Sequence, residues 1–304
     1  MDFTLNTDQA ALSGAIDRIA EKFELKPTDF HGFALFGQQL EQELDEGGYF
    51  DIAQVPELGT VAAAIAVDRL ARLPYTAEIA LSMLVRPQLA GGELPRPFAV
   101  IENGRPGRFV ASAKTLILID GDQIGIAHPA AGEVESVQSL YAYPMGRLKA
   151  SPKISALSAD EAANVRKWLR VALAAEASGL LHAAIASTVE HISVRKQFGR
   201  PLGTFQALRH RMAECAVVAG GVRLLALKAA WSADDGDAAL AASHAQDSAG
   251  RVIYDTHQML GAMGMTLEHP LHLWTYRLKA LMSELGGRGG QAEAVARFCF
   301  GTAA

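Results

Sequence analysis

The sequence has few cysteines and no excess of positive charge. Its 304 residues include only Cys215 and Cys299, which excludes the disulfide framework of a small secreted protein. Both lie in apolar helical stretches, so we expect buried thiols in a reducing compartment. The formal net charge is -5 and the pI is near 6.0, which gives no electrostatic reason to expect nucleic acid or an anionic membrane as a partner.

The sequence also lacks obvious membrane and export signals. We find no apolar run that reaches the length needed to cross a bilayer. The first residues, Met1 to Leu12, carry acidic side chains where a signal peptide would be basic and then apolar. We therefore expect a cytoplasmic protein, with no membrane partner, that acts on small molecules and other proteins.

Histidine and tryptophan form no recognisable site. Six histidines of the C-terminal half are spread over helices and form no zinc-type pair with a carboxylate, so we predict no metal site. The tryptophans lie on apolar helical faces and are expected to be core or interface residues. These residues are His191, His210, His244, His257, His269, His272, Trp168, Trp231 and Trp274.

The first third of the chain has the periodicity of helices. Leu12, Ile16 and Ile19 recur at three- and four-residue spacing after Thr7, which we expect to be the N-cap. Two or three further helices follow. The middle of the chain then changes character, because four short runs are rich in β-branched or aromatic residues.

These four runs predict a small antiparallel β unit. Asn103-Gly104 and Asp120-Gly121 are typical turn pairs between them, and we expect the unit to end near Met145. The runs are FAVIE, RFVAS, TLILI and QIGIA.

The last part of the chain is helical again. Ser158 and Glu161 form a capping-box pattern, and Leu169, Leu173 and Leu180 belong to an apolar stripe that follows it. Breaks divide the segment into four or five helices, which predicts an antiparallel bundle. The breaks lie at Arg200-Pro201, Asp234 to Gly236, Gly261 to Gly264 and Gly286 to Gly290.

The three patterns together predict a mainly α protein with three regions. We expect an N-terminal helical domain over residues 1–95, a reduced middle β domain over residues 96–150 and a C-terminal helical bundle over residues 151–304. The sequence contains no internal repeat.

The most informative stretch is RKQFGRPLGTFQ, from Arg195 to Gln206. It ends one long helix, crosses a Gly/Pro turn and starts the next helix at Thr204. Such a turn presents a cation, backbone N–H groups and a helix N-terminus, which suit a phosphate or pyrophosphate. Physical reasoning alone leaves a second interpretation open, a plain helix connection with a solvated arginine.

Two long motifs resemble the signature of the acyl-CoA dehydrogenase family. They are RKQFGRPLGTFQALRHRMAE and HQMLGAMGMTLEHP, which runs from His257 to Pro270, and they occur in the expected order and spacing. The resemblance is close over residues 158–285, looser in the N-terminal helices and poorest in the middle. It implies an acyl-CoA dehydrogenase-like fold and an FAD-dependent oxidoreductase.

The resemblance also implies where FAD would be held. In this family the C-terminal bundle of a neighbouring subunit holds the ADP half of FAD. By motif position, Arg195 would meet the pyrophosphate, and Ala262 stands where the family usually has glycine. The implied cofactor-binding residues are Arg195, Gln197, Phe198, Leu202, Phe205, Gln206, Gln258, Gly261 and Ala262.

The catalytic glutamate of the family has no counterpart here. That residue removes the α-proton while the flavin accepts the β-hydride, but its two known positions correspond to Leu285 and Leu169. The resemblance therefore implies no catalytic residue in this chain. Glu284 and Glu293 lie nearby, yet an isolated glutamate on a helix end or exposed face is more often solvated.

These deficits make the chain resemble one subunit of a heteromeric α2β2 acyl-CoA dehydrogenase. Between Pro97 and Leu148 there is no tryptophan and no counterpart of the segments that face the flavin ring in the family. Such heteromers are best represented in bacterial steroid catabolism, a branch of lipid metabolism. The resemblance implies a second acyl-CoA dehydrogenase-like subunit, an acyl-CoA substrate and an electron-transfer flavoprotein as acceptor.

Two other interpretations stay open. The first is a self-sufficient homomeric flavoenzyme in which Glu284 or Glu293 is the base. The second is a non-catalytic scaffold subunit that binds no cofactor. The presence of Arg195, Gln206 and Gln258 argues against the scaffold, because a scaffold needs no phosphate-facing cation at that turn.

Overall fold

The computed structural model describes residues 4–23, 32–89 and 94–301. Met1 to Phe3, the first residues of the segment compared with a signal peptide, lie outside this description. Helix α1 (Thr7–Lys22) begins with a capping box in which Asn6 accepts a hydrogen bond from the Gln9 backbone N–H at 2.8 Å. The predicted N-cap, Thr7, was wrong by one residue.

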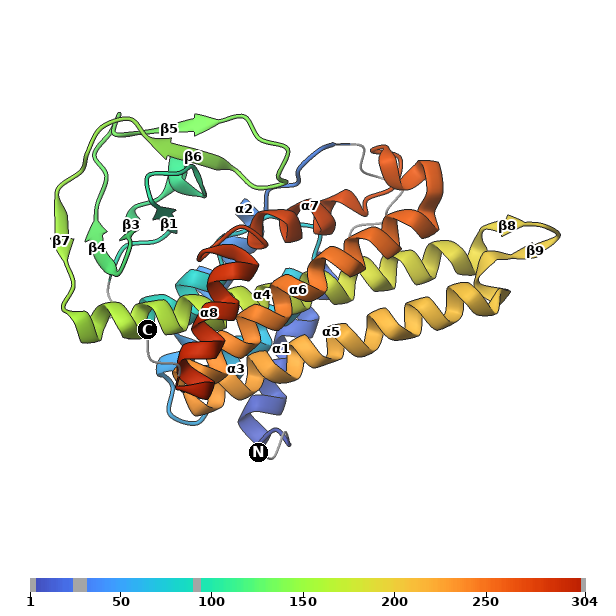
Figure 1. The fold of residues 1–304 in the computed structure, drawn as a ribbon, viewed down its shortest axis with the longest axis horizontal. Coiled ribbons are helices and arrows are strands. Elements are labelled where there is room, and N and C mark those ends of the chain that lie inside the picture. The colour runs from blue at the N-terminus through green and yellow to red at the C-terminus, as the bar shows by residue number, and fades with distance from the viewer. Residues whose placement is uncertain (1–3, 24–31, 90–93, 302–304) are drawn as a thin grey trace.

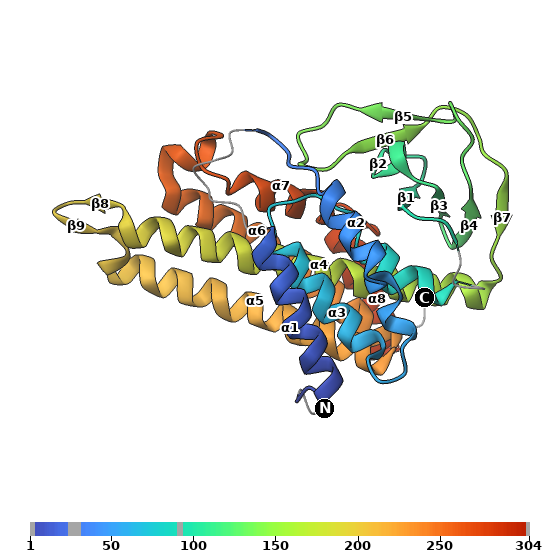
Figure 2. The same ribbon diagram turned by 180° about the vertical axis from the view of Figure 1, so that it is seen from behind.

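The N-terminal helices lie over one side of the molecule (Figure 2). Ile16 and Ile19 of α1 are buried, as the periodicity predicts. Helix α3 is rich in alanine, and most of its residues are buried. The elements after α1 are α2 (Gln38–Glu46), the 3-10 helix Tyr49–Gln54, α3 (Gly59–Ala71), the π-helix Leu81–Val85 and the 3-10 helix Arg86–Gln88.

Two small sheets form the middle region. The first has the order β1-β3-β4-β7 and the second β2-β6-β5. The strands are β1 (Phe98–Glu102), β2 (Gly107–Arg108), β3 (Thr115–Asp120), β4 (Gln123–Ala127), β5 (Val134–Val137), β6 (Met145–Leu148) and β7 (Ile154–Ala156). A small β region beside a helical bundle is therefore confirmed.

Three details of the β prediction were wrong. Strands β1 and β3 pair in parallel, because the chain between them crosses to the second sheet instead of turning back in a hairpin. The run RFVAS is mostly turn, since Phe109 has a φ of 63° and Val110–Ser112 is a 3-10 helix. The region continues beyond Met145 through β6 to the exposed strand β7, which ends at Ala156.

Helix α4 (Ala159–Val194) is the centre of the molecule (Figure 1). Ser158 and Glu161 form the predicted capping box, and Leu169, Leu173 and Leu180 are buried as predicted. The helix packs against α3, α5, α6 and α7. The other helices of the bundle are α5 (Gln206–Ser232), α6 (Asp235–Leu260), α7 (His272–Leu281) and α8 (Gly287–Phe300).

The length and apolarity of α4 correct one expectation. By length and composition it could cross a membrane, contrary to the prediction that no apolar run is long enough. However, 89% of its most apolar window is buried inside the protein, and the core helix of a globular fold meets the same criteria. Its apolar character is explained by neighbours on all sides.

The predicted breaks of the bundle were mostly close to the observed ones. Helix α5 begins at Gln206, two residues after the predicted Thr204, because residues 202–204 form a 3-10 turn. The glycines after Gly286 lie inside α8, which starts at Gly287. Cys215 is buried as expected, but Cys299 is exposed near the end of α8.

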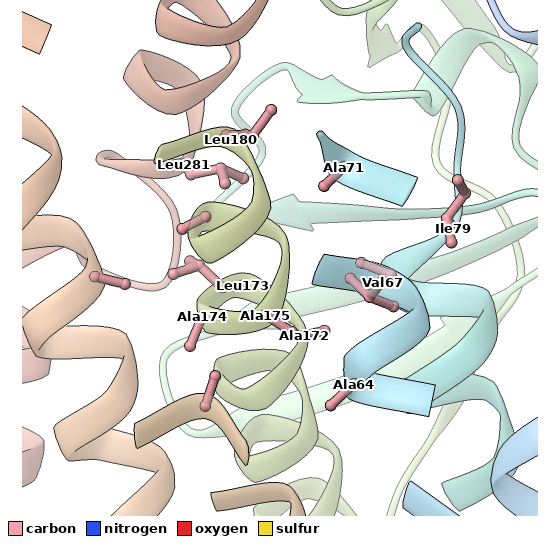
Figure 3. Packing of buried hydrophobic residues seen from close by; sticks show 14 of the residues in the cluster. Ala64, Val67, Ala71, Ile79, Ala172, Leu173, Ala174, Ala175, Leu180 and Leu281 are labelled. Carbon is pink, nitrogen blue, oxygen red and sulfur yellow. The ribbon is translucent and has the colours of Figure 1, made fainter. Parts of the chain in front are cut away.

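Small side chains let the helices of the core approach closely. Figure 3 shows α3 beside α4, with buried residues such as Ala64, Ala71 and Ala172 on the packed helices. The tightest point is Gly179 of α4, where an added Cβ would lie 2.1 Å from the Asp68 carbonyl oxygen of α3. A glycine is therefore required there.

We expect Gly179→Ala to destabilise the protein, because the methyl group would overlap the α3 backbone. The expected loss is about 1–3 kcal/mol or more in the free energy of unfolding, measured by chemical denaturation. Gly220→Ala is the matched control, since a Cβ there meets nothing within 4 Å and alanine should stabilise α5 by about 0.5–1 kcal/mol. A loss at Gly220 as large as that at Gly179 would contradict the close-contact explanation.

Candidate functional site

The first sequence motif forms a β-hairpin between α4 and α5. Strand β8 (Lys196–Gln197) pairs with β9 (Arg200–Pro201). The two residues between them, Phe198 and Gly199, have φ values of 53° and 81°, as a two-residue hairpin turn requires. The predicted Gly/Pro turn between the two helices is therefore a short β-hairpin, and its Phe198-Gly199 pair is not one of the typical hairpin turn pairs.

The implied cofactor residues of this hairpin face solvent. Arg195, Gln197 and Gln206 are exposed, and Phe198 is 84% exposed. Within the part of the chain that the structure describes, no carboxylate lies at ion-pairing distance from Arg195. The cation is therefore available to an external anion.

Two aromatic rings shape the same surface. Phe205, which is half-buried, contacts Phe198 edge to face with ring centroids 6.1 Å apart. The Arg200 guanidinium lies 4.1 Å from the Phe205 ring centroid, a cation–π contact. Leu202, also half-buried, follows β9 in the 3-10 turn. The hairpin thus presents cations and apolar rings side by side.

The second motif lies at the end of α6. Gln258 is exposed in the last turn, and Gly261 and Ala262 begin the 3-10 helix Gly261–Met265. Gly261 has a φ of 60°, and an added Cβ would meet nothing within 4 Å, so its backbone faces open space. A cavity of about 430 Å³ adjoins it. The lining is Gly250, Ile253, Tyr254, His257, Gln258, Gly261, Met265, Tyr276 and Lys279.

The two motifs occupy the same end of the bundle, opposite the β region (Figures 1 and 2). A ring contact links the two regions, because His191 of α4, just before the first motif, and His269 of the second motif have centroids 5.4 Å apart. Burial and the nearby His191 and His272 lower the pKa of His269 to about 4. Both groups of implied cofactor residues therefore lie at one end of the molecule.

A separate cavity of about 390 Å³ lies between the β region and the bundle. Its wall includes Leu169 of α4 and Leu285 of the loop before α8. These are the two positions at which the family resemblance expects the catalytic glutamate. The structure brings both positions into one cavity, and leucine occupies each of them.

Glu284 also lines this cavity, and it is not the solvated residue that we predicted. Its side chain is 29% exposed and accepts a hydrogen bond from Arg108 Nε at 2.7 Å. Burial raises the pKa of Glu284, and Arg108 offsets part of that rise. Glu293, by contrast, is exposed on α8 as expected.

Arg108 connects Glu284 to a second buried carboxylate. Its Nη1 donates to Glu176 Oε2 at 2.6 Å, and the Tyr143 hydroxyl donates to Glu176 Oε1 at 2.7 Å. Burial alone would lower the pKa of Arg108, but Glu176 and Glu284 raise it well above its ordinary value. These four residues, the Arg108 cluster, join β2, the loop before β6, α4 and the loop before α8.

The loop that carries Leu285 is held from several sides. Leu285 has a φ of 55°, which is unusual for a branched residue. Its N–H donates to Glu102 Oε2 at 2.9 Å, and its carbonyl oxygen accepts from Gln291 Nε2 at 2.7 Å. Gln246 of α6 donates to the Glu284 carbonyl oxygen at 2.9 Å. The surrounding elements therefore impose this backbone conformation.

The other singled-out side chains are mostly structural. Trp168 and Trp274 are buried, while Trp231 is exposed on α5. His269 accepts a hydrogen bond from the Leu271 backbone N–H at 3.2 Å, so it helps to begin α7 as expected. Among the described residues, no group of three or more His, Cys, Asp and Glu side chains is placed to hold a metal ion.

Residues 162–299 match the acyl-CoA dehydrogenase C-terminal domain family. Among curated proteins, the chain is 31% identical over 212 residues to the acyl-CoA dehydrogenase FadE34 of Mycobacterium tuberculosis. That match covers 66% of this chain and 30% of FadE34. The chain spans at most about half the length of the curated relatives that it matches.

Two solved structures are similar over almost the whole chain. A chain of the ChsE4–ChsE5 complex from Mycobacterium tuberculosis matches with a TM-score of 0.73 at 21% identity. The match covers 100% of this chain and 100% of that one. A variant of the Tcur3481–Tcur3483 steroid ACAD has a TM-score of 0.73 at 21% identity, covering 98% of this chain and 99% of that one. At this identity the similarity establishes the fold.

We expect Arg108→Leu to destabilise the protein strongly, because Glu176 would stay buried without its cation. Removing one partner of a buried ion pair costs about 3–5 kcal/mol, which chemical denaturation can measure. Arg105→Leu is the control: Arg105 lines the same cavity but is exposed and forms no ion pair within the described residues. Its change should stay within about 0.5 kcal/mol. Equal effects of the two variants would show that the Arg108 cluster does not stabilise this junction.

Proposed function

The chain belongs to the acyl-CoA dehydrogenase family, and we propose that it is one subunit of a heteromeric FAD-dependent acyl-CoA dehydrogenase. In this proposal it helps to hold the ADP half of FAD at a subunit interface. The partner subunit supplies the catalytic glutamate. The reaction is the α,β-dehydrogenation of an acyl-CoA, with a steroid-derived acyl group as the favoured class and an electron-transfer flavoprotein as the acceptor.

The position of the cofactor motifs carries the proposal. Arg195 and Gln258 lie at the end of the bundle opposite the β region, whereas the cavity with Leu169 and Leu285 lies beside that region. Residues so placed do not face the cavity of their own chain. An exposed, unpaired cation on a motif of this family is best explained by a site that is completed in another chain.

The local chemistry fits the phosphate-bearing half of a dinucleotide. Arg195 offers a charge-assisted donor, and the open Gly261 backbone lets a ligand approach closely. The adjoining cavity of about 430 Å³ is of the size that a ligand pocket needs. When bound, FAD would supply the hydride acceptor. This chain's own contribution would be to hold its pyrophosphate and orient its adenosine end.

The two expected positions of the catalytic glutamate favour proton removal by the partner. Leu169 and Leu285 cannot accept a proton, and Glu284 is occupied by Arg108. A second candidate is a self-sufficient enzyme in which Glu284 is the base. It is favoured by one observation, that Glu284 lines the cavity and has a pKa raised by burial. The ion pair with buried Arg108 argues against it, because it stabilises the charged carboxylate.

The comparisons support an assembly of unlike subunits. Two similar structures, ChsE4–ChsE5 and Tcur3481–Tcur3483, are each named for two proteins, and the second is called a steroid ACAD. Exposed apolar side chains at the end of α4, in the hairpin and along α5 and α6 also suit a partner surface. They are Val194, Phe198, Val217, Leu224, Trp231 and Tyr254.

We expect the chain purified alone to be colourless or poorly soluble, because its interface and cofactor site would be incomplete. Coexpression with an acyl-CoA dehydrogenase-like subunit that has a complete β domain and a glutamate should give one FAD per pair of unlike chains. Flavin absorbance against protein concentration measures this ratio. Stable yellow protein from this chain alone, or one FAD per chain, would contradict the proposal.

In the paired protein, we expect Arg195→Ala to weaken FAD retention without unfolding the chain. The variant removes a charge-assisted hydrogen bond to the pyrophosphate, so the Kd for FAD should rise roughly 10- to 150-fold. Fluorescence titration of flavin into the stripped protein gives the Kd. Lys196→Ala, which removes a neighbouring cation outside the implied cofactor set, should change it much less. Unchanged affinity in Arg195→Ala would leave the hairpin as a plain helix connection.

A further inference from the structure

We propose that His257 is a positioning residue that fixes the 3-10 turn Gly261–Met265, here called the glycine turn, so that its backbone faces the dinucleotide half of FAD. The inference rests on the proposed function, since it concerns the same cofactor surface. His257 is not among the residues that the family resemblance implies. It is identified by its contacts in this structure.

The His257 ring bridges the glycine turn and α7. Its Nδ1 lies 2.6 Å from the Gly264 carbonyl oxygen of the glycine turn. Its Nε2 lies 2.9 Å from Thr275 Oγ1, and Thr275 is fully buried on α7. The ring therefore connects the last turn of α6 both to the glycine turn and to α7.

The hydrogen bonds define the protonation of the ring. A carbonyl oxygen can only accept, so Nδ1 must carry the proton that it donates to Gly264. Nε2 of the neutral ring then accepts from the Thr275 hydroxyl at 2.9 Å, and the Leu271 carbonyl oxygen, at 3.2 Å, is the more distant acceptor for the same hydroxyl. Burial lowers the pKa of His257, and the charges of Lys279 and His272 lower it further against the opposing Gly264 bond. The neutral ring thus satisfies both partners.

The glycine turn is folded tightly against α6. A Cβ on Gly264 would lie 2.9 Å from the His257 carbonyl oxygen and 3.1 Å from Leu260 Cβ. Gly261, at the start of the turn, has a φ of 60° and open space on its outer side. The inner side of the turn is therefore anchored by close packing and by His257. The outer side is left open toward the cavity.

His257 and the open side of the glycine turn line the same cavity. His257, Gln258 and Gly261 all line the cavity of about 430 Å³, together with Tyr276. The His257 and Tyr276 rings lie nearly parallel, with an interplanar angle of 10° and centroids 6.4 Å apart. A backbone N–H binds an anion well only over a range of a few tenths of an ångström in donor–acceptor distance. A glycine turn that is released from His257 would therefore hold FAD more weakly.

The test compares three variants in the coexpressed pair by the Kd for FAD. His257→Phe keeps a ring beside Tyr276 and removes both hydrogen bonds, so the Kd should rise roughly 5- to 10-fold. His257→Asn can still donate to Gly264 and should stay within about twofold of the parent. Thr275→Val removes the hydroxyl's bonds to His257 and to the Leu271 carbonyl oxygen but keeps the Gly264 bond, so the Kd should also stay close to the parent. This order would distinguish a hydrogen-bonded anchor from simple packing.

Two results would overturn the inference. One is an unchanged Kd in His257→Phe, and the other is an Asn variant as weak as the Phe variant. Amide hydrogen exchange over residues 261–266 of the FAD-free pair gives an independent measurement. Exchange there should be faster in His257→Phe and close to the parent in His257→Asn.

The same exchange measurement separates this inference from the proposed function. If the parent pair binds no FAD, the proposed function fails. Faster exchange in His257→Phe alone would then still support His257 as the anchor of the turn. Equal exchange in all three proteins would overturn that role as well.

Discussion

The ion pairs of Arg108 are the interaction on which the junction between the β region and the bundle depends. Arg108 comes from β2, Glu176 from the middle of α4 and Glu284 from the loop before α8. A buried cation is tolerated only where carboxylates and hydrogen bonds compensate for lost hydration. The position of the β region, the shape of the cavity and the conformation of the Leu285 loop are therefore fixed together.

This constraint explains the role of Glu284, which lies next to one of the two positions at which the family resemblance expects the catalytic glutamate. A general base needs a lone pair that is free to reach the substrate, and Glu284 directs Oε1 to Arg108 instead. The carboxylate of Glu284 therefore helps to hold the β region against the bundle.

The sequence predicted the features that are encoded locally. The Ser158 cap and the apolar face of α4 depend on neighbouring residues, and they were found where expected. The parallel pairing of β1 and β3 depends on a crossover that no short pattern records. Strands β5 and β7 were missed because they have only four and three residues, too few for alternation to stand out.

The candidate site was predicted in part, for a similar reason. The implied cofactor residues were taken from two motifs, and the structure groups them at one end of the bundle. The partner of Glu284 was not predictable, since Arg108 lies 176 positions away along the chain. His257 stands beside a predicted residue, but only the fold brings Gly264 and Thr275 to its two nitrogens.

The 36 residues of α4 give the helix a length of about 54 Å. Leu169, on the wall of the cavity, lies in the first half of the helix, and Arg195 follows its last turn. Inserting one residue between them would move Arg195 by about 1.5 Å and rotate it by about 100°. The separation and relative orientation of the cavity and the hairpin are thus set by the length of a single helix.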